Sequence, residues 1–188
     1  MYYSLNYLRS VGFKLLGNNI KISKLTKFIH PNNISLKSNI QIDDYCFLSG
    51  NSGLIDIGNY VHIGRNTTLI SGSKIVLSDF SGVSNNCSLF GKSDIYNGSC
   101  LTNPTIPNKY RKIDSGDIIL GKHVIIGSNS LILPNTYIQD GAAIGALSLV
   151  NKNLNGWTIY GGNPLKNIKE RSKECLKYEQ KLIKDLQK

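Results

Sequence analysis

The sequence of 188 residues lacks several features that would assign it to a class of proteins at once. No apolar run approaches the roughly 20 residues that a membrane-spanning helix needs. No charged segment followed by an apolar one opens the chain, so we expect no signal peptide and a cytoplasmic protein. No compact basic run interleaved with aromatic residues is present, and this argues against a nucleic-acid-binding protein.

Cysteine, histidine and acidic residues are also scarce. The four cysteines form no CxxC pair and have no metal-ligand spacing, so we expect reduced thiols and no metal site: they are Cys46, Cys87, Cys100 and Cys175. Twelve acidic residues stand against 22 Lys and Arg, a net charge of +10. The cations gather near the two ends of the chain, and a few of them beside a phosphorylated ligand would explain the excess.

What the sequence does contain is a six-residue repeat. Neither a helix nor an alternating strand has this period. Three such units make one triangular turn of about 18 residues, and stacked turns bury a continuous column of aliphatic side chains. Glycines that follow the aliphatic residues would supply corner conformations that a Cβ atom strains. The unbroken part of the repeat is Leu120, Ile126, Ile132, Ile138, Ile144 and Val150.

The same repeat runs upstream with one long interruption. Further turns begin at Leu36, Ile57 and Leu77, and the register is lost between Leu89 and Leu120. A long irregular segment inside a regular solenoid is usually functional, and its prolines and aromatic residues favour an ordered arm. We therefore expect an all-β solenoid, a left-handed parallel β-helix. The predicted parts are a helical capping segment at 1–33, the β-helix at 34–162 with an inserted arm at 90–118, and a C-terminal helix at 163–188.

The last coil ends in the motif Ile159-Tyr-Gly-Gly-Asn-Pro-Leu-Lys166. With the repeat, this motif resembles the hexapeptide-repeat acyltransferase superfamily over residues 34–171, about three quarters of the chain. Leu165 stands where the superfamily usually has Ala, while Lys166 and Arg171 are present. The resemblance implies an acyl-CoA cosubstrate, with acetyl-CoA expected, and a homotrimer whose sites lie between subunits.

The arm is similar to that of galactoside/maltose-type O-acetyltransferases of surface-polysaccharide clusters. Its frame is Thr102-Asn103-Pro104, then Tyr110-Arg111-Lys112, then a coil that starts at Ile118-Ile-Leu-Gly121. In those enzymes the catalytic histidine occupies the position of Asn103. An amide can orient a substrate or stabilise an oxyanion, but it cannot take a proton. Either the base lies elsewhere, or the chain binds without catalysing.

His62 is the candidate base. It precedes the inward-pointing Ile63, so its ring should face outward, and Gly82 one turn later leaves space beside it. Sugar N-acetyltransferases that resemble this fold have a similar Val-His-Ile-Gly segment beside the active site. We take His62 and Asn103 as the catalytic candidates, with an interface histidine as the alternative for His62. His123 is expected at a structural corner, and His30 is expected to be unrelated to the chemistry.

A histidine base works best beside a carboxylate that fixes its tautomer. Asp44, 18 residues before His62, is the candidate partner. Asp79 and Asp94 are further candidates, and turn capping is an alternative for each of the three. Asp94 is the preferred ligand of the acceptor hydroxyl. The predicted substrate contacts are Asp44, Asp79, Asn85, Asp94 and Tyr110.

The expected CoA contacts lie along the later coils. By resemblance the pantetheine follows Gly127, Ser128, Gly145 and Ala146. Fixed cations would meet the phosphates, with a solvated surface charge as the alternative: Lys152, Lys166 and Arg171.

The leading hypothesis is an acyl-CoA-dependent O-acyltransferase that acetylates a sugar or oligosaccharide in surface-polysaccharide biosynthesis. The first alternative is an N-acetyltransferase that acts on an amino sugar or nucleotide sugar. A catalytically inactive binding scaffold remains open because of Asn103. A metal-binding relative of the carbonic-anhydrase type is disfavoured, because three histidines without a converging spacing are too few for its interfacial site.

Overall fold

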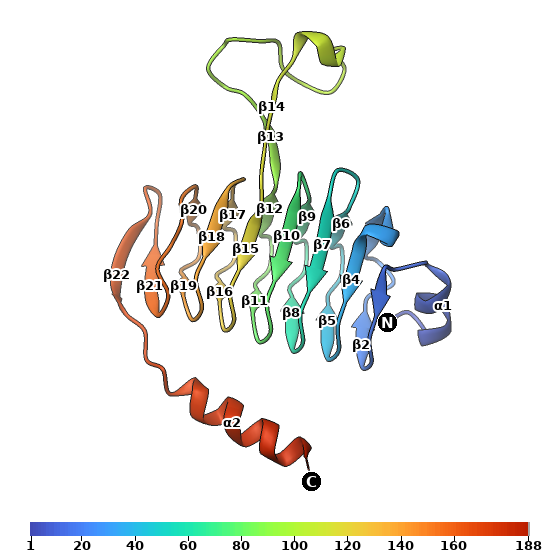
Figure 1. Ribbon diagram of the computed structural model, residues 1–188, viewed down its shortest axis with the longest axis vertical. Coiled ribbons are helices and arrows are strands. Elements are labelled where there is room, and N and C mark those ends of the chain that lie inside the picture. Colours follow the sequence, from blue (N-terminus) through green and yellow to red (C-terminus); the bar gives the residue numbers. More distant parts are fainter. Residues whose placement is uncertain (188) are drawn as a thin grey trace.

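The computed structural model describes residues 1–187 and is a three-sided parallel β-solenoid (Figure 1). Short strands follow one another around the column, and each pairs with the strand one coil above and one coil below. The first sheet holds β1 (Leu15–Leu16), β4 (Ile34–Leu36), β7 (Leu54–Ile57), β10 (Lys74–Leu77), β15 (Ile118–Leu120) and β18 (Thr136–Ile138).

The other two faces of the column have the same construction. The second sheet holds β2 (Ile20–Ile22), β5 (Ile40–Ile42), β8 (Val61–Ile63), β11 (Gly82–Val83), β16 (Ile125–Ile126), β19 (Ala143–Ile144), β21 (Thr158–Gly161) and β22 (Lys166–Glu170). The third sheet holds β3 (Lys27–Ile29), β6 (Phe47–Ser49), β9 (Thr68–Ile70), β12 (Ser88–Phe90), β17 (Leu131–Ile132) and β20 (Leu149–Val150). Within these three sheets all ladders are parallel except that of β21 with β22.

The aliphatic repeat fills the interior of the column, as the six-residue period predicts. Equivalent residues of successive coils stand above one another, so that Ile63 pairs with Val83 and Val83 with Ile126. Each of these side chains is buried. Because every coil contacts only its neighbours, the core is a stack of aliphatic layers along the column.

The N-terminal boundary predicted at residue 34 lies too late. Strands β1 to β3 already form a coil that pairs with β4, β5 and β6. Its inward residues are Leu16, Ile22 and Phe28, which have the same six-residue spacing. Only a short helix, α1 (Leu5–Ser10), and a 3-10 turn (Pro31–Asn33) lie outside this coil in the first 33 residues, and the buried Leu8 of α1 packs onto the core.

The glycines of the repeat act by close approach, and not by the corner conformation that the sequence suggested. A Cβ atom on Gly121 would lie 2.6 Å from the backbone nitrogen of Asp140, and one on Gly127 would lie 2.4 Å from that of Ala146. The left-handed residue lies two positions after each of these glycines, at His123 and at Asn129, and asparagine tolerates this conformation. The other left-handed corner residues include Asn19, Asn39, Tyr60, Phe80, Leu147 and Trp157.

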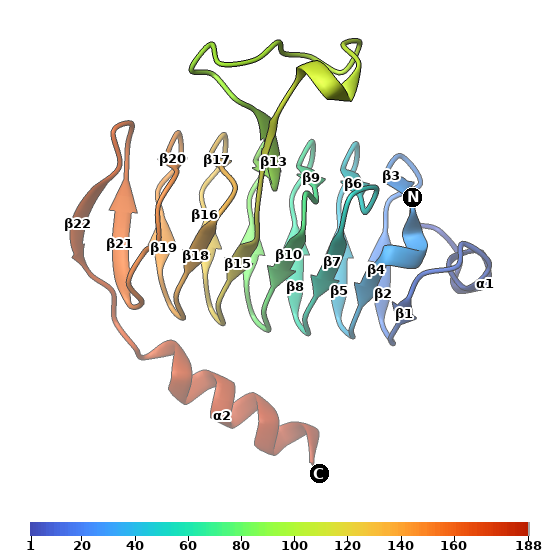
Figure 2. The same cartoon turned by 45° about the horizontal axis from the view of Figure 1, so that its top comes forward.

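The arm leaves the column between the third and the first sheet (Figures 1 and 2). Its base is an antiparallel pair of strands, β13 (Lys92–Asp94) and β14 (Ile113–Ser115). A loop with a 3-10 turn (Asn108–Tyr110) closes the far end. The arm therefore stands away from the column instead of lying on it.

The C-terminal end of the column is closed by β22 and followed by helix α2 (Cys175–Leu186). A guanidinium nitrogen of Arg171 donates to the backbone oxygens of His123, Gly141 and Ala142, at 2.7, 3.0 and 3.2 Å. Nε2 of His123 lies 2.8 Å from a carboxylate oxygen of Glu179, which joins α2 to the corner. His123 thus has the structural role expected of it. Within residues 1–187 no helix is long and apolar enough to cross a membrane.

Candidate active site

The candidate site lies on the outer face of the second sheet and at its corner with the third. On this face one outward residue of each coil stands beside the next, in the order Gln41, His62, Gly82 and Ile125. The alternation of inward and outward side chains places His62 outside because the inward position is taken by Ile63.

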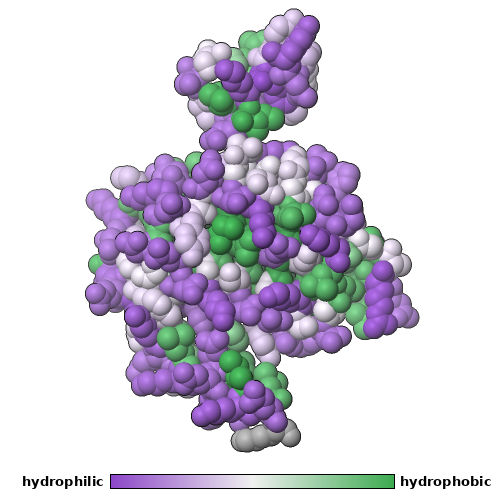
Figure 3. Space-filling model, in the orientation of Figure 1, coloured by the Kyte–Doolittle hydropathy of each residue, from purple (hydrophilic) through white to green (hydrophobic). Residues whose placement is uncertain are grey.

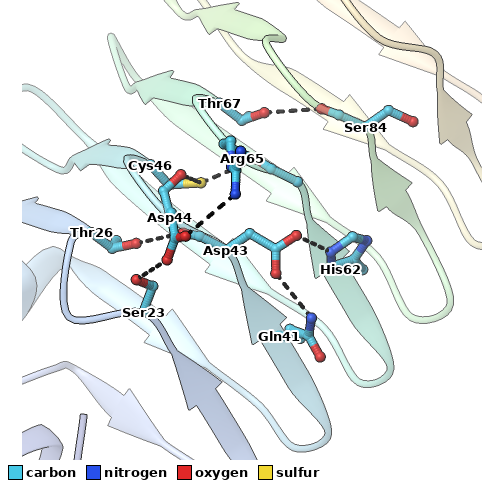
Figure 4. A network of polar contacts seen from close by, with 11 residues as sticks. Ser23, Thr26, Gln41, Asp43, Asp44, Cys46, His62, Arg65, Thr67 and Ser84 are labelled. Atoms are coloured by element: carbon cyan, nitrogen blue, oxygen red, sulfur yellow. Dashed lines mark hydrogen bonds and ion pairs between the residues drawn. The ribbon is translucent and has the colours of Figure 1, made fainter. Parts of the chain in front are cut away.

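His62 is paired with Asp43 (Figure 4). Its Nε2 lies 2.8 Å from Oδ2 of Asp43, and Gln41 Nε2 donates to Oδ1 of the same carboxylate at 2.9 Å. Partial burial opposes ionisation of Asp43, but the hydrogen bonds from Gln41 and His62 hold its pKa below the ordinary value. An ionised carboxylate can only accept, so Nε2 carries the proton and Nδ1 is left with its lone pair free to act as a base.

Asp44, the partner predicted for His62, points elsewhere. Its carboxylate accepts a hydrogen bond from Ser23 and lies 3.6 Å from a guanidinium nitrogen of Arg65 (Figure 4). Successive side chains at a corner point in different directions. Asp43 therefore faces His62, whereas Asp44 points towards Ser23 and Arg65. The spacing of 18 residues identified the right corner and the wrong aspartate.

A pocket of about 230 Å³ opens beside His62. Gly82 forms its floor, and no atom would lie within 4 Å of a Cβ atom placed there. Ser84, half-buried at the edge, has a side-chain hydroxyl without a hydrogen-bond partner among residues 1–187. The pocket also brings together predicted residues of two kinds, the substrate contact Asn85 and the cofactor contact Ser128.

The predicted pantetheine contacts stack at one corner. Gly127 lies against the backbone of Gly145 and Ala146 in the next coil, so close that a Cβ atom would clash. Ser128 belongs to this corner and to the pocket beside His62. The pocket thus continues into the corner on which the sequence placed the cofactor.

Asp79 lies apart from this site. It sits at the opposite corner, between the first and the second sheet, where Oδ1 accepts the backbone N–H of Asn59 at 2.8 Å. Lys37 Nζ lies 3.9 Å from the same oxygen. The Asp79 carboxylate therefore supports the turn at Asn59, and it does not line the pocket beside His62.

Asp94 is held at the base of the arm by two donors. The backbone N–H of Asn103 and the guanidinium of Arg111 each donate to its carboxylate at 3.0 Å. The same two groups, Asn103 first, hold the pKa of Asp94 below its ordinary value. Asp94 is therefore a carboxylate at neutral pH, with its remaining lone pairs available to a ligand.

The other arm candidates have mainly local contacts. Oδ1 of Asn103 accepts from the backbone N–H and the hydroxyl of Thr105, at 2.9 and 2.6 Å, and thereby closes a turn. Tyr110 is exposed beside Lys109, whose ammonium lies 4.8 Å from the ring centre. Within one chain the arm points away from the second sheet (Figure 2), so it does not bring these residues to His62.

The three predicted phosphate-binding cations are separated from one another. Lys152 follows β20 on the third sheet, and Lys166 begins β22 at the end of the second; both are exposed. Arg171 already uses one nitrogen on three backbone oxygens. Of the three, Lys166 lies nearest the glycine corner, because it pairs with Gly161 one coil beyond Gly145.

Nucleophilic and metal chemistry have little support in the described residues. Cys46 and Cys87 are buried under the corners, and burial raises the pKa of Cys46 to about 11. A thiol held in the protonated form is a poor acyl carrier. Within residues 1–187, no group of three or more His, Cys, Asp or Glu side chains is placed to hold a metal ion.

The sequence reasoning missed Asp43 and Ser84. The strand register indicates Asp43. Gln41 and Ile42 pair with His62 and Ile63, and Asp43 directly follows Ile42. The equivalent position in other coils is glycine, at Gly64, Gly127 and Gly145. A serine in place of this glycine is the sequence feature that distinguishes Ser84.

Comparison with known proteins agrees with this geometry. No protein-family model matches the chain. A dTDP-4-amino-4,6-dideoxy-D-glucose acyltransferase of Escherichia coli is 41% identical over 172 residues, which cover 92% of this chain and 90% of the relative. The crystal structure of AntD, an N-acyltransferase from Bacillus cereus in complex with dTDP and 3-hydroxybutyryl-CoA, is 39% identical, covers 100% of this chain and 98% of that chain, and superimposes with a TM-score of 0.95.

A more distant structure agrees in fold alone. A maltose O-acetyltransferase from Clostridium difficile is 20% identical, with a TM-score of 0.63 over 89% of this chain and 74% of that chain. The relative from Escherichia coli is named for an amino-sugar acceptor, and AntD is named an N-acyltransferase. Fold, repeat and full-length similarity lead to one assignment. The chain belongs to the sugar acyltransferases of the hexapeptide-repeat, left-handed β-helix type.

Proposed function

We propose that this protein transfers an acyl group from a CoA thioester to the amino group of a deoxyamino sugar carried on a nucleoside diphosphate. The observation that carries the proposal is the arm, which presents the carboxylate of Asp94 and has Asn103 in place of a histidine. A sugar hydroxyl needs a base as it attacks. A neutral amine attacks by its own lone pair and can lose its proton afterwards.

The reaction balances without a cofactor beyond the thioester. The amine nitrogen bonds to the thioester carbonyl carbon, and the C–S bond of the resulting tetrahedral intermediate breaks. The products are an amide and CoA thiol. The proton lost by nitrogen passes to Nδ1 of His62 or to the departing sulfur. Acyl transfer is direct in this scheme, since no cysteine among residues 1–187 lines the pocket beside His62.

Ser84 and Asp94 are the proposed contacts of the amine. Solved structures of AntD include S84A and D94N variants, one in complex with dTDP-4-amino-4,6-dideoxyglucose and CoA and one with dTDP and CoA. This chain has a serine and an aspartate at the same numbers, and it overlaps that protein over 98% of both chains. A hydroxyl and a carboxylate can orient the amine towards the thioester.

CoA is the proposed cosubstrate, bound along the corner of Gly127, Ser128, Gly145 and Ala146. Its thioester would then reach the pocket at Ser128, beside His62. Lys166 is the cation best placed for the phosphates of the cofactor. A CoA thioester as cosubstrate favours a reaction in the cytoplasm.

A homotrimer is the proposed assembly. Asp94 ends β13 in the arm and Ser84 follows β11 of the second sheet, and Figure 1 shows the arm and β11 at opposite sides of the column. The arm of a second copy would therefore complete the site. Figure 3 shows an apolar area in the middle of the column below the arm, which a neighbouring copy would cover. Mixing Asp94→Asn and Ser84→Ala chains should then give more activity than either variant alone, since mixed trimers hold some intact sites.

The test of the function is thiol release from acetyl-CoA and 3-hydroxybutyryl-CoA with paired acceptors. The pairs are dTDP-4-amino-4,6-dideoxyglucose against dTDP-glucose, and a free amino sugar against maltose. We expect turnover with the amino acceptor and an amide in the product by mass spectrometry. An ester formed only with the hydroxyl acceptors would replace the proposal by O-acyl transfer, for which the His62–Asp43 pair would supply the base.

A further inference from the structure

A second groove adjoins the pocket beside His62. It has a volume of about 520 Å³ and lies on the outer face of β2, β5 and β8. The corner of Gly127 and Gly145 lies on the other side of the pocket. We call this second groove the amide groove; its polar lining is Asn19, Lys21, Asn39, Gln41, Tyr60 and His62. His62 lines both hollows, so they lie on its two sides, towards Gln41 and towards Gly82.

The register of the second sheet fixes the length of the groove. Lys21 stands beside Gln41, and Gln41 beside His62. Two strand spacings, about 10 Å, therefore separate the backbone at Lys21 from that at His62. A sugar seated at His62 would direct a group attached to it along this row, and a diphosphate with its nucleoside has the length to follow it.

The chemistry of the lining suits such a group. Lys21 is exposed and has no ion-pair partner among residues 1–187, and no carboxylate lines the groove. At the corner, Asn19 Nδ2 donates to Oδ1 of Asn39 at 2.8 Å, which leaves amide groups of both side chains for the edge of a base. Tyr60 offers an aromatic ring, one side of which already stacks on Phe80 with centroids 5.0 Å apart.

The alternative path from the pocket is less suitable for an anion. It leads past Asn85 into a hollow of about 390 Å³ that is lined also by Met1, Tyr2, Asp43, Asp44 and Arg65. Two carboxylates repel a diphosphate, and the guanidinium of Arg65 lies 3.6 Å from Asp44. The electrostatics of the two hollows therefore distinguish them.

We infer that the amide groove binds the nucleoside diphosphate of the acceptor, with Lys21 on the diphosphate and Tyr60 against the base. The inference rests on the proposed function, because it names the part of the acceptor that lies beyond the sugar. The groove then selects acceptors that carry a nucleotide over free amino sugars. Lys21 and Tyr60 are binding residues in this scheme, and neither takes part in acyl transfer.

The test is calorimetric titration of dTDP, thymidine and CoA into the full-length protein and its variants. We expect Lys21→Ala to weaken dTDP binding by about tenfold, the loss of one charge-assisted contact, while thymidine and CoA bind as before. Lys21→Glu should weaken dTDP binding further. Tyr60→Leu should weaken both dTDP and thymidine, and its melting temperature checks that the stack on Phe80 is not simply lost.

Two controls separate the possible outcomes. Lys74→Ala removes a cation on the first sheet, where it lies 3.3 Å from Asp56, and should leave dTDP binding unchanged. Arg65→Ala removes the cation of the hollow lined by Asp43 and Asp44, and it should also leave dTDP binding unchanged. Unchanged dTDP binding in Lys21→Ala, or a loss in Arg65→Ala alone, overturns the assignment of the groove while the acyltransferase proposal stands. Failure of the wild-type protein to bind dTDP overturns both.

Discussion

His62 and Asp43 form a pair in which Nε2 of the ring lies 2.8 Å from the carboxylate, on adjacent coils of the second sheet. The carboxylate, which is also bonded to Gln41, holds the ring in the tautomer that leaves Nδ1 unprotonated. A histidine in this arrangement differs from an ordinary surface histidine, because its orientation and tautomer are both set. The pair adjoins Gly82, the outward residue that stands beside His62 in the next coil.

We expect His62 to take the proton that the amine loses after its attack, so replacing His62 by Ala should lower kcat by up to about 10²-fold. The KM for acyl-CoA should change little. Asp43→Asn should give a smaller loss, because the ring remains but its tautomer is no longer fixed. His30→Asn is the matched control, since His30 is exposed and has the left-handed conformation that Asn tolerates. Full activity of His62→Ala would exclude His62 as the base.

Substitution of Asp94 should affect both activity and the arm. Its pKa is lowered in the folded protein by Asn103 and Arg111, so its contribution to stability is present above the unfolded pKa of about 3.9. It is lost as the pH falls through the lower, folded value. Hydrogen exchange of the arm amides, corrected for intrinsic rates, should therefore show protection at neutral pH that is lost in acid. Asp94→Asn should show weaker protection already at neutral pH.

Ser84→Ala provides the comparison for Asp94→Asn. Its hydroxyl has no partner within residues 1–187, so its removal should leave the melting temperature unchanged. The KM for the amino acceptor should rise by several-fold, the value of one hydrogen bond of about 1 kcal/mol. A drop in melting temperature without any change in KM would mean that Ser84 supports the corner instead of the substrate.

The interior of the column could be predicted from the sequence, because its rule is local. An aliphatic residue every sixth position needs only its own spacing to be recognised, and Ile126 and Ile132 are buried as the repeat requires. The spacing Leu16, Ile22, Phe28 obeys the same rule, but it is harder to recognise because glycine and polar residues surround it.

The corners could not be read with the same precision. A corner changes the direction of the chain within two residues, so the choice between Asp43 and Asp44 depends on geometry that the repeat does not encode. The arm is a still harder case, since the proposed site needs Asp94 from the arm of a second copy, and a repeat within one chain does not indicate how copies assemble. Glycines raise a third difficulty, because the sequence does not distinguish close packing, as at Gly127, from empty space, as at Gly82.

Gly82 and Gly127 should respond oppositely to alanine. At Gly82 a Cβ atom meets nothing within 4 Å and the backbone is not left-handed, so Gly82→Ala should leave stability unchanged or raise it by about 0.5 kcal/mol. The methyl group would still occupy the floor of the pocket, and kcat/KM should fall by about tenfold. At Gly127 the methyl group would lie 2.4 Å from a backbone nitrogen. That variant should lose about 2 kcal/mol or more of unfolding free energy.

Thermal denaturation and steady-state kinetics on both glycine variants decide between these roles. A stable, fully active Gly82→Ala protein would show that the space beside His62 is not used by a substrate. Equal destabilisation of the two variants would mean that the column relaxes less around Gly82 than the open space there implies.

Arg171 presents the last choice between a structural and a cofactor-binding role. Its guanidinium donates to three backbone oxygens at the corner of His123, the shortest at 2.7 Å, and these would be left without that donor in Arg171→Ala. Each buried carbonyl that loses its partner costs about 1 kcal/mol or more, so the melting temperature should fall by several degrees. Lys166→Ala, at an exposed position, should leave the melting temperature unchanged and raise the KM for acyl-CoA. If Arg171→Ala raises that KM without lowering the melting temperature, the guanidinium serves the phosphates of the cofactor and the contacts at the corner are secondary.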